Sequence, residues 1–434
     1  MTNFHMQEGF FMLSNTTQSR PKTMELSYSI VVISLCACFL FYKYILQIYP
    51  SVVTNQLMRE FQLSGAGLGN LAATFYYTYM ITQLFVGILL DKYSTRWLTA
   101  AAIFCCGLGV MLFSQTHSLF IAELSRGLMG VGVAFATVAY MKLAAVWFSP
   151  RQYAFVGGLL ATAAMAGAIF GQAPLAYFID AVGWRECLFI TGLIGFALAI
   201  LFVFIVRDAP EKSSVAQKAE LVSWRDLLDI VKNRQNWLLT FYSGLAFSPI
   251  AIFGGLWGNP FLQQAYHLNN TQAASLLSLV FIGLGIGSPL LGILSDRLGA
   301  RRNVMLSSTM VACLALVLVL YCHQLPLWAV SVLLFIFGFG LGSFMLGFAI
   351  GKEINKPAFT ATVVAMINTS DALLDSFTEP GIGKLLDLLW DGKVVDGVHY
   401  FSLQSYHLAL SVLPIYLLIA ALLLVWVREA PADL

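Results

Sequence analysis

Four polar residues recur at helical spacing within one largely apolar stretch of the sequence: Asn368, Asp371, Asp375 and Glu379. Steps of three and four residues place all of them on one face of a helix. Carboxylates that faced lipid there would be strongly unfavourable. We therefore expect this face to line a water-filled cavity or a contact between two parts of the protein, where a carboxyl group can carry a proton.

Two of these acids, Asp371 and Asp375, are the ones that we expect to bind a solute or a coupling proton. The alternative is a helix that lines the mouth of a cavity with acids that are simply hydrated. Glu379, with its neighbour Lys384, fits this alternative better than Asp371 does, although Glu379 also stays a candidate.

A second candidate group lies near the start of the chain, where Lys43 stands between Tyr42 and Tyr44 and close to Gln47. A buried lysine at this position can hold a carboxylate, and the neighbouring rings can pack against an organic solute. Lysine side chains also extend towards the membrane surface from positions near a helix end. Both interpretations of Lys43 stay open.

A third buried charge is predicted in the stretch Arg126-Gly-Leu-Met-Gly130-Val-Gly132. Arginine within a membrane span costs roughly 2.5–3.5 kcal/mol on insertion scales, so it should face the interior of a helical bundle. The glycines allow a neighbouring helix to approach closely. Trp257 belongs to a further set of aromatic residues that can line a solute site, although most rings of this kind serve packing.

The composition defines the elements that must position these residues. The chain has 434 residues, of which 59% are hydrophobic and only 11% are charged. Soluble domains carry about 25% charged residues, so this chain should lie within a lipid bilayer. No basic tract indicates nucleic-acid binding. The seven cysteines fit neither a zinc site nor a disulfide framework, and no metal or cofactor is expected.

Twelve membrane-spanning helices are predicted, which makes the fold all-α. Their ranges are 27–49, 68–90, 97–115, 119–146, 153–178, 186–206, 236–258, 273–295, 303–322, 327–350, 359–386 and 407–427. The domain limits that follow are a tail (1–26), a six-helix bundle (27–206), a linker (207–235), a second six-helix bundle (236–427) and a C-terminal tail (428–434). Within the linker, Ser223 to Lys232 is predicted to form a short surface helix.

The distribution of Lys and Arg predicts the orientation of the chain. If the N-terminus is cytoplasmic, 17 of the 24 basic residues fall in cytoplasmic segments and four on the opposite side. This asymmetry predicts that both termini are cytoplasmic. The expected location is the inner membrane of a bacterium.

A charged motif occurs twice with a constant offset. The first copy reads Gly87-Ile-Leu-Leu-Asp91-Lys92-Tyr-Ser94-Thr-Arg96, and the second reads Gly292-Ile-Leu-Ser-Asp296-Arg297-Leu-Gly299-Ala-Arg301-Arg302. The two copies are 205 residues apart, which indicates a duplicated half. In each copy the Asp and the Arg can form a pair that holds one conformation and breaks in another. The alternative is that these charges only fix the topology.

These motifs resemble those of the major facilitator superfamily over nearly the whole chain. The second copy fits the family's loop motif at every position, whereas the first has Ser94 in place of a glycine and Trp97 in place of a basic residue. The resemblance implies two six-helix bundles around a central site. For Arg126 it implies a role in proton coupling or in helix cohesion.

Narrower resemblances concern the solute. The glycines 158, 167 and 171 resemble an antiporter-associated motif, but the expected proline is displaced to Pro174. The stretches 256–263 and 390–400 are similar to bacterial relatives of the lysosomal dipeptide carriers and of phagosomal nutrient transporters. The displaced proline counts against an exporter, and the similarity of the two stretches favours amino acids or short peptides as the solute.

The sequence therefore predicts a secondary transporter that moves a small carboxylate or zwitterion, such as an amino acid or short peptide, by proton symport and alternating access. It is expected to function as a monomer and not as an enzyme. The alternatives are an efflux antiporter for drugs or siderophores and a receptor that binds a solute without transport.

Overall fold

The computed structural model describes residues 22–209, 230–322, 324–356, 360–395 and 397–429. The predicted tail (1–26) and the predicted surface helix Ser223 to Lys232 lie mostly outside these residues, and the described parts, 22–26 and 230–232, are helical. We refer to residues 22–209 as the first half and to residues 230–429 as the second half.

Long helices dominate the first half. Its elements are α1 (Lys22–Ile48), the 3-10 helix η1 (Tyr49–Val52), α2 (Thr54–Phe61), α3 (Gly65–Lys92), α4 (Thr95–Gln115), α5 (Leu119–Trp147), α6 (Pro150–Phe170), α7 (Ala173–Val182) and α8 (Trp184–Ile205). The predicted fifth span is therefore two helices, because the chain leaves helical geometry at Gln172, which has φ −101° and ψ −109°.

The second half has the same order of long crossings, but it breaks them at different places. They are α10 (Arg234–Ile252), the π-helix η2 (Phe253–Trp257), α11 (Gly258–Tyr266), α12 (Asn270–Leu298), α13 (Arg301–Tyr321), α14 (Leu327–Leu341), the 3-10 helix η3 (Gly342–Phe344), α15 (Met345–Glu353), α16 (Thr360–Leu388), the strands β1 (Val394–Val395) and β2 (Val398–His399), α17 (Leu403–Leu410) and α18 (Val412–Leu424). The strands form an antiparallel hairpin in which Val394 pairs with His399.

Eleven helical segments of the described chain are long and apolar enough to cross a membrane. The twelfth predicted span corresponds to α16, which has 29 residues but carries the acidic face. Its length is close to the 28 residues of α3, against which it packs, so its polar residues rather than its length set it apart. The architecture is the predicted all-α membrane fold.

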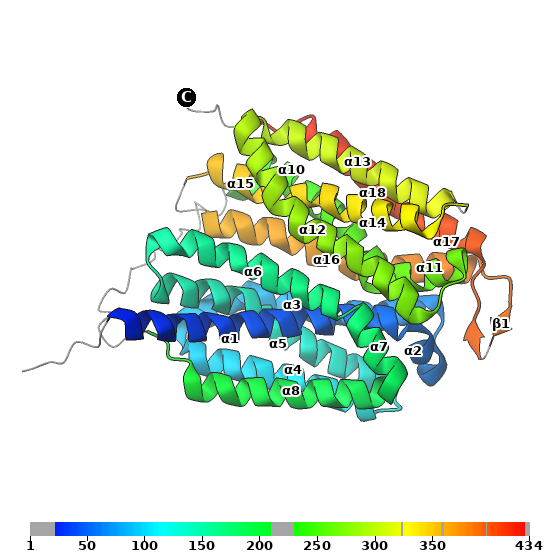
Figure 1. Ribbon diagram of the computed structural model, residues 1–434, viewed down its shortest axis with the longest axis horizontal. Coiled ribbons are helices and arrows are strands. Elements are labelled where there is room, and N and C mark those ends of the chain that lie inside the picture. The colour runs from blue at the N-terminus through cyan, green and yellow to red at the C-terminus, as the bar shows by residue number, and fades with distance from the viewer. Residues whose placement is uncertain (1–21, 210–229, 323, 357–359, 396, 430–434) are drawn as a thin grey trace, which may run out of the picture.

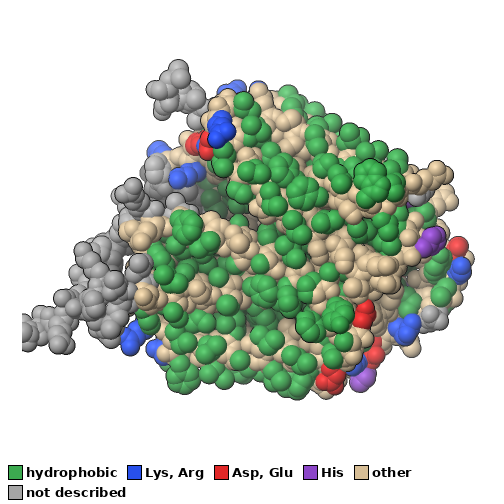
Figure 2. Space-filling model, in the orientation of Figure 1, with side chains coloured by type: hydrophobic (Ala, Val, Ile, Leu, Met, Phe, Trp, Pro, Cys, Tyr) green, Lys and Arg blue, Asp and Glu red, His purple; other side chains and the backbone are tan. Residues whose placement is uncertain are grey.

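The helices run roughly parallel to one another between two ends of the molecule (Figure 1). We call the end where α1 begins and α18 ends the termini face, and the end that carries the β1–β2 hairpin the hairpin face. On the side shown in Figure 2, charged side chains gather towards these two ends and hydrophobic side chains cover the middle. This distribution fits a belt surrounded by lipid.

Glycines allow the close approaches that hold each half together. In the second half, Gly283 faces the backbone of Phe335, and Gly338 faces that of Val280, so that α12 and α14 pack backbone to backbone. In the first half, Gly130 of the arginine stretch faces Phe75 of α3. The predicted packing role of these glycines is confirmed.

Four helices form the seam between the halves: α3 packs against α16, and α6 packs against α12. These are the second and fifth long crossings of each half. The acidic face of α16 therefore lies on an element that contacts both halves.

Candidate functional site

The first half contributes a buried lysine in an aromatic setting. Lys43 on α1 is only 6% exposed, and its Nζ lies 4.8 Å from the ring centre of Tyr79 and 5.2 Å from that of Tyr44. One turn further along α1, Gln47 Nε2 donates a hydrogen bond to Tyr76 Oη at 3.3 Å. Among the residues that the structure describes, Lys43 has no carboxylate within ion-pair distance.

Arg126 ties three helices of the first half together. Its side chain is 1% exposed and donates to the carbonyl oxygens of Leu46 (2.8 Å) on α1 and Ala72 (3.0 Å) on α3. The guanidinium carbon lies 5.2 Å from the ring centre of Tyr49 and 4.8 Å from that of Phe75. The predicted burial is confirmed, and these contacts support the cohesion role of Arg126.

The acidic face of α16 is buried. Asp371, Asp375 and Glu379 are 8%, 1% and 2% exposed. Two serines of α10 donate hydrogen bonds to the aspartates: Ser243 Oγ donates to Asp371 Oδ1 at 3.0 Å, and Ser248 Oγ donates to Asp375 Oδ1 at 2.5 Å. The fourth member of the face, Asn368, is half-buried.

Glu379 corrects one expectation from the sequence. Its neighbour Lys384 is exposed, but Glu379 itself is not a hydrated acid at the mouth of a cavity. The difference arises because α3 covers it: Gly69 faces the backbone of Glu379 and Pro380. Its carboxyl Oε2 has no hydrogen-bond partner among the described residues.

Residues of both halves surround Glu379. Trp257 Nε1 donates to the main-chain oxygen of Glu379 at 3.2 Å, and the charge of Arg126 acts on the Glu379 carboxyl group. Tyr76, the partner of Gln47, is buried on α3, the helix that packs against α16. The structure therefore brings most of the predicted residues into one buried polar region across the seam.

Sequence reasoning missed Gln172, which lies between the last glycine of the antiporter-like pattern and Pro174. Gln172 is fully buried at the break between α6 and α7, and its Nε2 donates to the main-chain oxygen of Gly254 at 2.5 Å. Gly254 belongs to the π-helix η2, and π-helical turns are frequent at functional sites. A glutamine followed by Pro174 within an apolar span was the available signal.

The predicted latch motifs lie at the termini face, and their pairing differs between the two copies. In the second copy, Arg301 pairs with Asp296 at 3.1 Å as expected, and it also pairs with Glu353 at 2.8 Å. In the first copy, Asp91 pairs with Lys142 of α5 at 3.1 Å rather than with Arg96. Asp91 and Arg96 do not pair in this conformation: the main-chain N–H of Arg96 donates to Asp208, and its Nε donates to the Val203 carbonyl oxygen.

The other motif residues shape the turns of the termini face. Gly299 ends α12 in the left-handed conformation with φ 59°, and Arg302 donates its main-chain N–H to Glu429. Lys92 lies over the ring of Tyr93, while Arg297 is exposed. A Cβ atom placed on Gly87 or Gly292 would meet no described atom within 4 Å.

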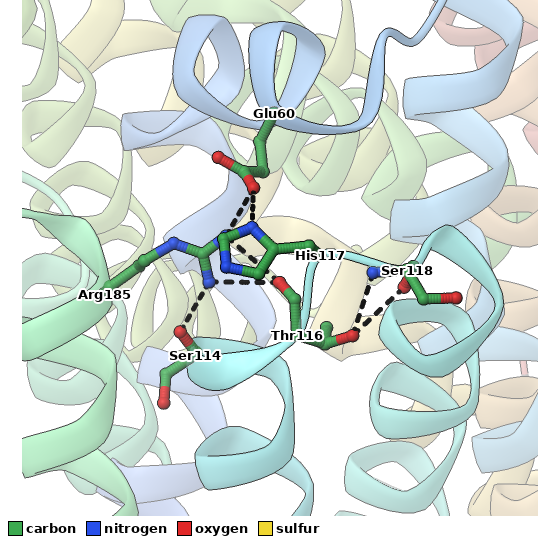
Figure 3. Close-up of polar contacts among 6 residues, drawn as sticks. All are labelled: Glu60, Ser114, Thr116, His117, Ser118 and Arg185. Carbon is green, nitrogen blue, oxygen red and sulfur yellow. Dashed lines mark hydrogen bonds and ion pairs between the residues drawn. The ribbon is translucent and has the colours of Figure 1, made fainter.

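A second charged cluster fixes the loops of the first half at the hairpin face (Figure 3). Glu60 Oε1 lies 2.5 Å from His117 Nδ1 and 2.6 Å from Arg185 Nη2, and Arg185 also donates to the carbonyl oxygens of Ser114 and Thr116. Partial burial raises the pKa of Glu60, but the hydrogen bonds from His117 and Arg185 outweigh it and lower that pKa below its ordinary value. The cluster joins α2 to the ends of α4 and α8.

Two hollows lie close to the seam. One, of about 250 Å³ including space open to solvent, is lined at the hairpin face by polar residues of both halves, among them Ser51, Thr54, Gln263 and Asn270. The other, beside Arg126 and Tyr49 within the first half, is too narrow to hold a water molecule.

Comparison with known proteins identifies the family. The sequence profile of the Major Facilitator Superfamily matches residues 31–373 and 245–433. The probable sulfoacetate transporter SauU of Cupriavidus necator is 23% identical over 285 residues, which cover 63% of this chain and 66% of that protein. The probable hexose phosphate transport protein of Chlamydia pneumoniae is 22% identical over 334 residues, which cover 70% of this chain and 73% of that protein.

The fold has counterparts among solved structures. The bacterial homologue of the human lysosomal transporter Spinster, in an inward-facing and unoccupied conformation, superposes with a TM-score of 0.78 at 14% identity, covering 93% of this chain and 99% of that one. At this identity the likeness shows the fold alone. The chain spans about half to two thirds of the length of the first curated relatives that it matches.

Proposed function

We propose that this multi-pass membrane protein, which belongs to the Major Facilitator Superfamily, carries a small organic solute with a carboxylate or comparable acidic group across the bilayer. The two halves would rock around the buried polar region and expose it alternately on the two sides. The family comprises transporters rather than enzymes, so the polar region is interpreted as a binding site and not as a catalytic centre.

The observation that carries this proposal is the buried cation of Lys43. A lysine within a membrane span is costly unless another group compensates its charge. Lys43 has two aromatic rings beside it but, within the described parts of the chain, no acid at ion-pair distance. An acidic group of the solute would supply that partner, and the rings of Tyr44 and Tyr79 would contact its organic part.

The names of the two relatives point to the same kind of solute, since sulfoacetate and hexose phosphate both carry acidic groups. Amino acids and short peptides, which the sequence favoured, belong to the same broad class because they also carry a carboxylate. We therefore propose organic acids and zwitterions as the solute class.

Proton symport is the proposed source of energy. Asp371, Asp375 and Glu379 are buried, and among the described residues none of them has a basic partner at ion-pair distance. Ser243 and Ser248 hold the two aspartates from the neighbouring helix. This arrangement places exchangeable carboxyl groups beside the seam, where a change of conformation would alter their access to water.

The arrangement of contacts favours a site that opens to the termini face in this conformation. Hydrogen bonds between the halves lie towards the hairpin face, where Asn270 Nδ2 donates to the Val52 carbonyl oxygen at 2.9 Å and Gln172 reaches Gly254. Following the distribution of basic residues, we propose that the termini face is cytoplasmic, that the membrane is the inner membrane of a bacterium and that the monomer is the working unit.

The proposal is tested by reconstituting the purified protein in liposomes and measuring uptake of labelled organic acids, amino acids and peptides with and without an inward proton gradient. Wild-type protein should accumulate at least one acidic solute, and the gradient should stimulate accumulation. Lys43→Ala should lose uptake of this solute, whereas the matched control Lys384→Ala, which alters an exposed lysine, should retain it. Solute binding without uptake or counterflow would instead identify a receptor.

A further inference from the structure

Each half ends its fifth crossing with an aspartate that contacts the other half. In the second half this residue is Asp387, at the end of α16. Its two carboxylate oxygens accept hydrogen bonds from the main-chain N–H groups of Gly65 (2.7 Å) and Ala66 (2.8 Å). These are the first two residues of α3, whose N–H groups have no partner within their own helix.

The first half presents its counterpart in Asp180, near the end of α7. Its Oδ2 accepts a hydrogen bond from Thr271 Oγ1 at 2.6 Å, and Thr271 is the second residue of α12. Ala66 and Thr271 are 205 residues apart, which is the offset of the duplicated motif, and Asp180 and Asp387 are 207 residues apart. The two offsets agree to within two residues, so the two contacts occupy corresponding places in the two halves.

We propose that Asp387 and Asp180 form a pair of carboxylate latches, related by the internal repeat, that hold the hairpin face closed. The inference rests on the proposed alternating access, because only a carrier needs this face to open. Separation of the halves would break both contacts and the backbone packing of Gly65 against Gly383.

The stronger of the two latches is that of Asp387. Its side chain is 23% exposed and faces the positive end of the α3 dipole, where a carboxylate is favourable. Ser64, the N-cap residue of α3, accepts a hydrogen bond through its Oγ from the main-chain N–H of Gly67. The main-chain N–H groups of Gly65 and Ala66 therefore depend on Asp387 for an acceptor. Asp180 is exposed and binds a hydroxyl group, which makes its contact weaker.

Three other ionisable residues of the described chain lie near Asp387, but none of them accepts a hydrogen bond from the N-terminus of α3. His399 of the hairpin lies with Nδ1 3.8 Å from Asp387 Oδ1 and stacks on Trp390 at 3.8 Å between ring centres. Lys384, one turn earlier on α16, is exposed. Asp391 accepts a hydrogen bond from the main chain of Lys393 within the same hairpin, which makes it a matched control acid.

Hydrogen–deuterium exchange of the full-length protein in detergent tests the latches without any transport measurement. The reporters are peptides that cover η1 of the first half and η2 of the second half, which contact each other across the seam. Asp387→Asn should raise exchange of both reporters roughly tenfold, Asp180→Asn should raise it less, and Asp391→Asn should leave it unchanged.

Two results would overturn the inference: unchanged exchange in Asp387→Asn, or faster exchange confined to the first turn of α3, which would show a local cap and no latch. If Asp387→Asn does not fold, Asp387→Glu and Asp180→Asn provide the test, and both must raise exchange of the reporters. A seam that loosens as predicted in a protein that takes up no solute would support the latches and contradict the proposed function.

Discussion

Substitution of Gly69 tests the packing between the two halves, because this residue of α3 lies against the backbone of α16 in the other half. A Cβ atom at this position would lie 2.6 Å from Pro380 Cα and 2.7 Å from the Glu379 carbonyl carbon. Ordinary contacts between carbon atoms are about 3.5–4.0 Å, so Gly69→Ala forces the two backbones apart by roughly 1 Å. Overpacking of this kind costs about 1–3 kcal/mol, which corresponds to a 5- to 150-fold shift against the closed hairpin face.

The halves can relieve this strain by separating, whereas Gly130→Ala would strain Phe75 within one half and cannot be relieved in that way. We therefore expect Gly69→Ala to slow uptake 5- to 150-fold while solute binding persists and Tm falls less than in Gly130→Ala. Gly381→Ala, on the facing helix with no described atom within 4 Å of the new Cβ, should behave as wild type. Wild-type uptake by Gly69→Ala, or a loss of Tm equal to that of Gly130→Ala, would refute the reasoning.

Three further predictions follow from single contacts. Glu60→Gln should destabilise the protein by about 1 kcal/mol at pH 7 and progressively less as the pH falls. The pKa of Glu60 is lowered in the folded protein, so its stabilising effect needs the ionised carboxylate and is lost on acidification. Thermal unfolding of wild type and variant at pH 7 and at about pH 4 checks this, and an equal difference in Tm at both pH values would contradict it. Asp371→Asn should sharply reduce pH-dependent uptake, and unchanged uptake at every pH would remove Asp371 from the mechanism. Arg126→Ala should remove two buried hydrogen bonds from a charged donor, at about 1–3 kcal/mol each, and should lower Tm more than Lys142→Ala, whose side chain is part-exposed; an equal effect would disprove the cohesion role.

The spacing of apolar and polar residues, and the energetic cost of placing charges in lipid, made much of this fold predictable from the sequence. The apolar stretches located most helices to within a few residues, although the seventh continues to Tyr266, and the cost of charge in lipid required burial of Arg126 and of the acids on α16. The offset of 205 residues, recognised from charged loops at one face, also relates Ala66 to Thr271 at the opposite face. These features depend on local composition and spacing, which a sequence displays directly.

Pairing between distant helices could not be predicted in the same way. Nothing in the sequence around Asp91 distinguishes Arg96 from Lys142 as its partner, because that choice depends on how α5 packs against α3. Glu379 is buried because a glycine on another helix brings a second backbone over it. The breaks at Gln172 and in η2 likewise reflect packing across the seam, which no single segment encodes.

The central claim, that Lys43 binds the acidic group of the solute, is tested most directly by comparing an acid with its amide. Once a solute is known from uptake, its binding and that of the uncharged amide analogue are measured by thermal shift on wild-type protein, Lys43→Ala and Lys384→Ala. The account predicts that wild type and Lys384→Ala prefer the acid strongly and that Lys43→Ala binds acid and amide alike. A preference for the acid that survives in Lys43→Ala would contradict it.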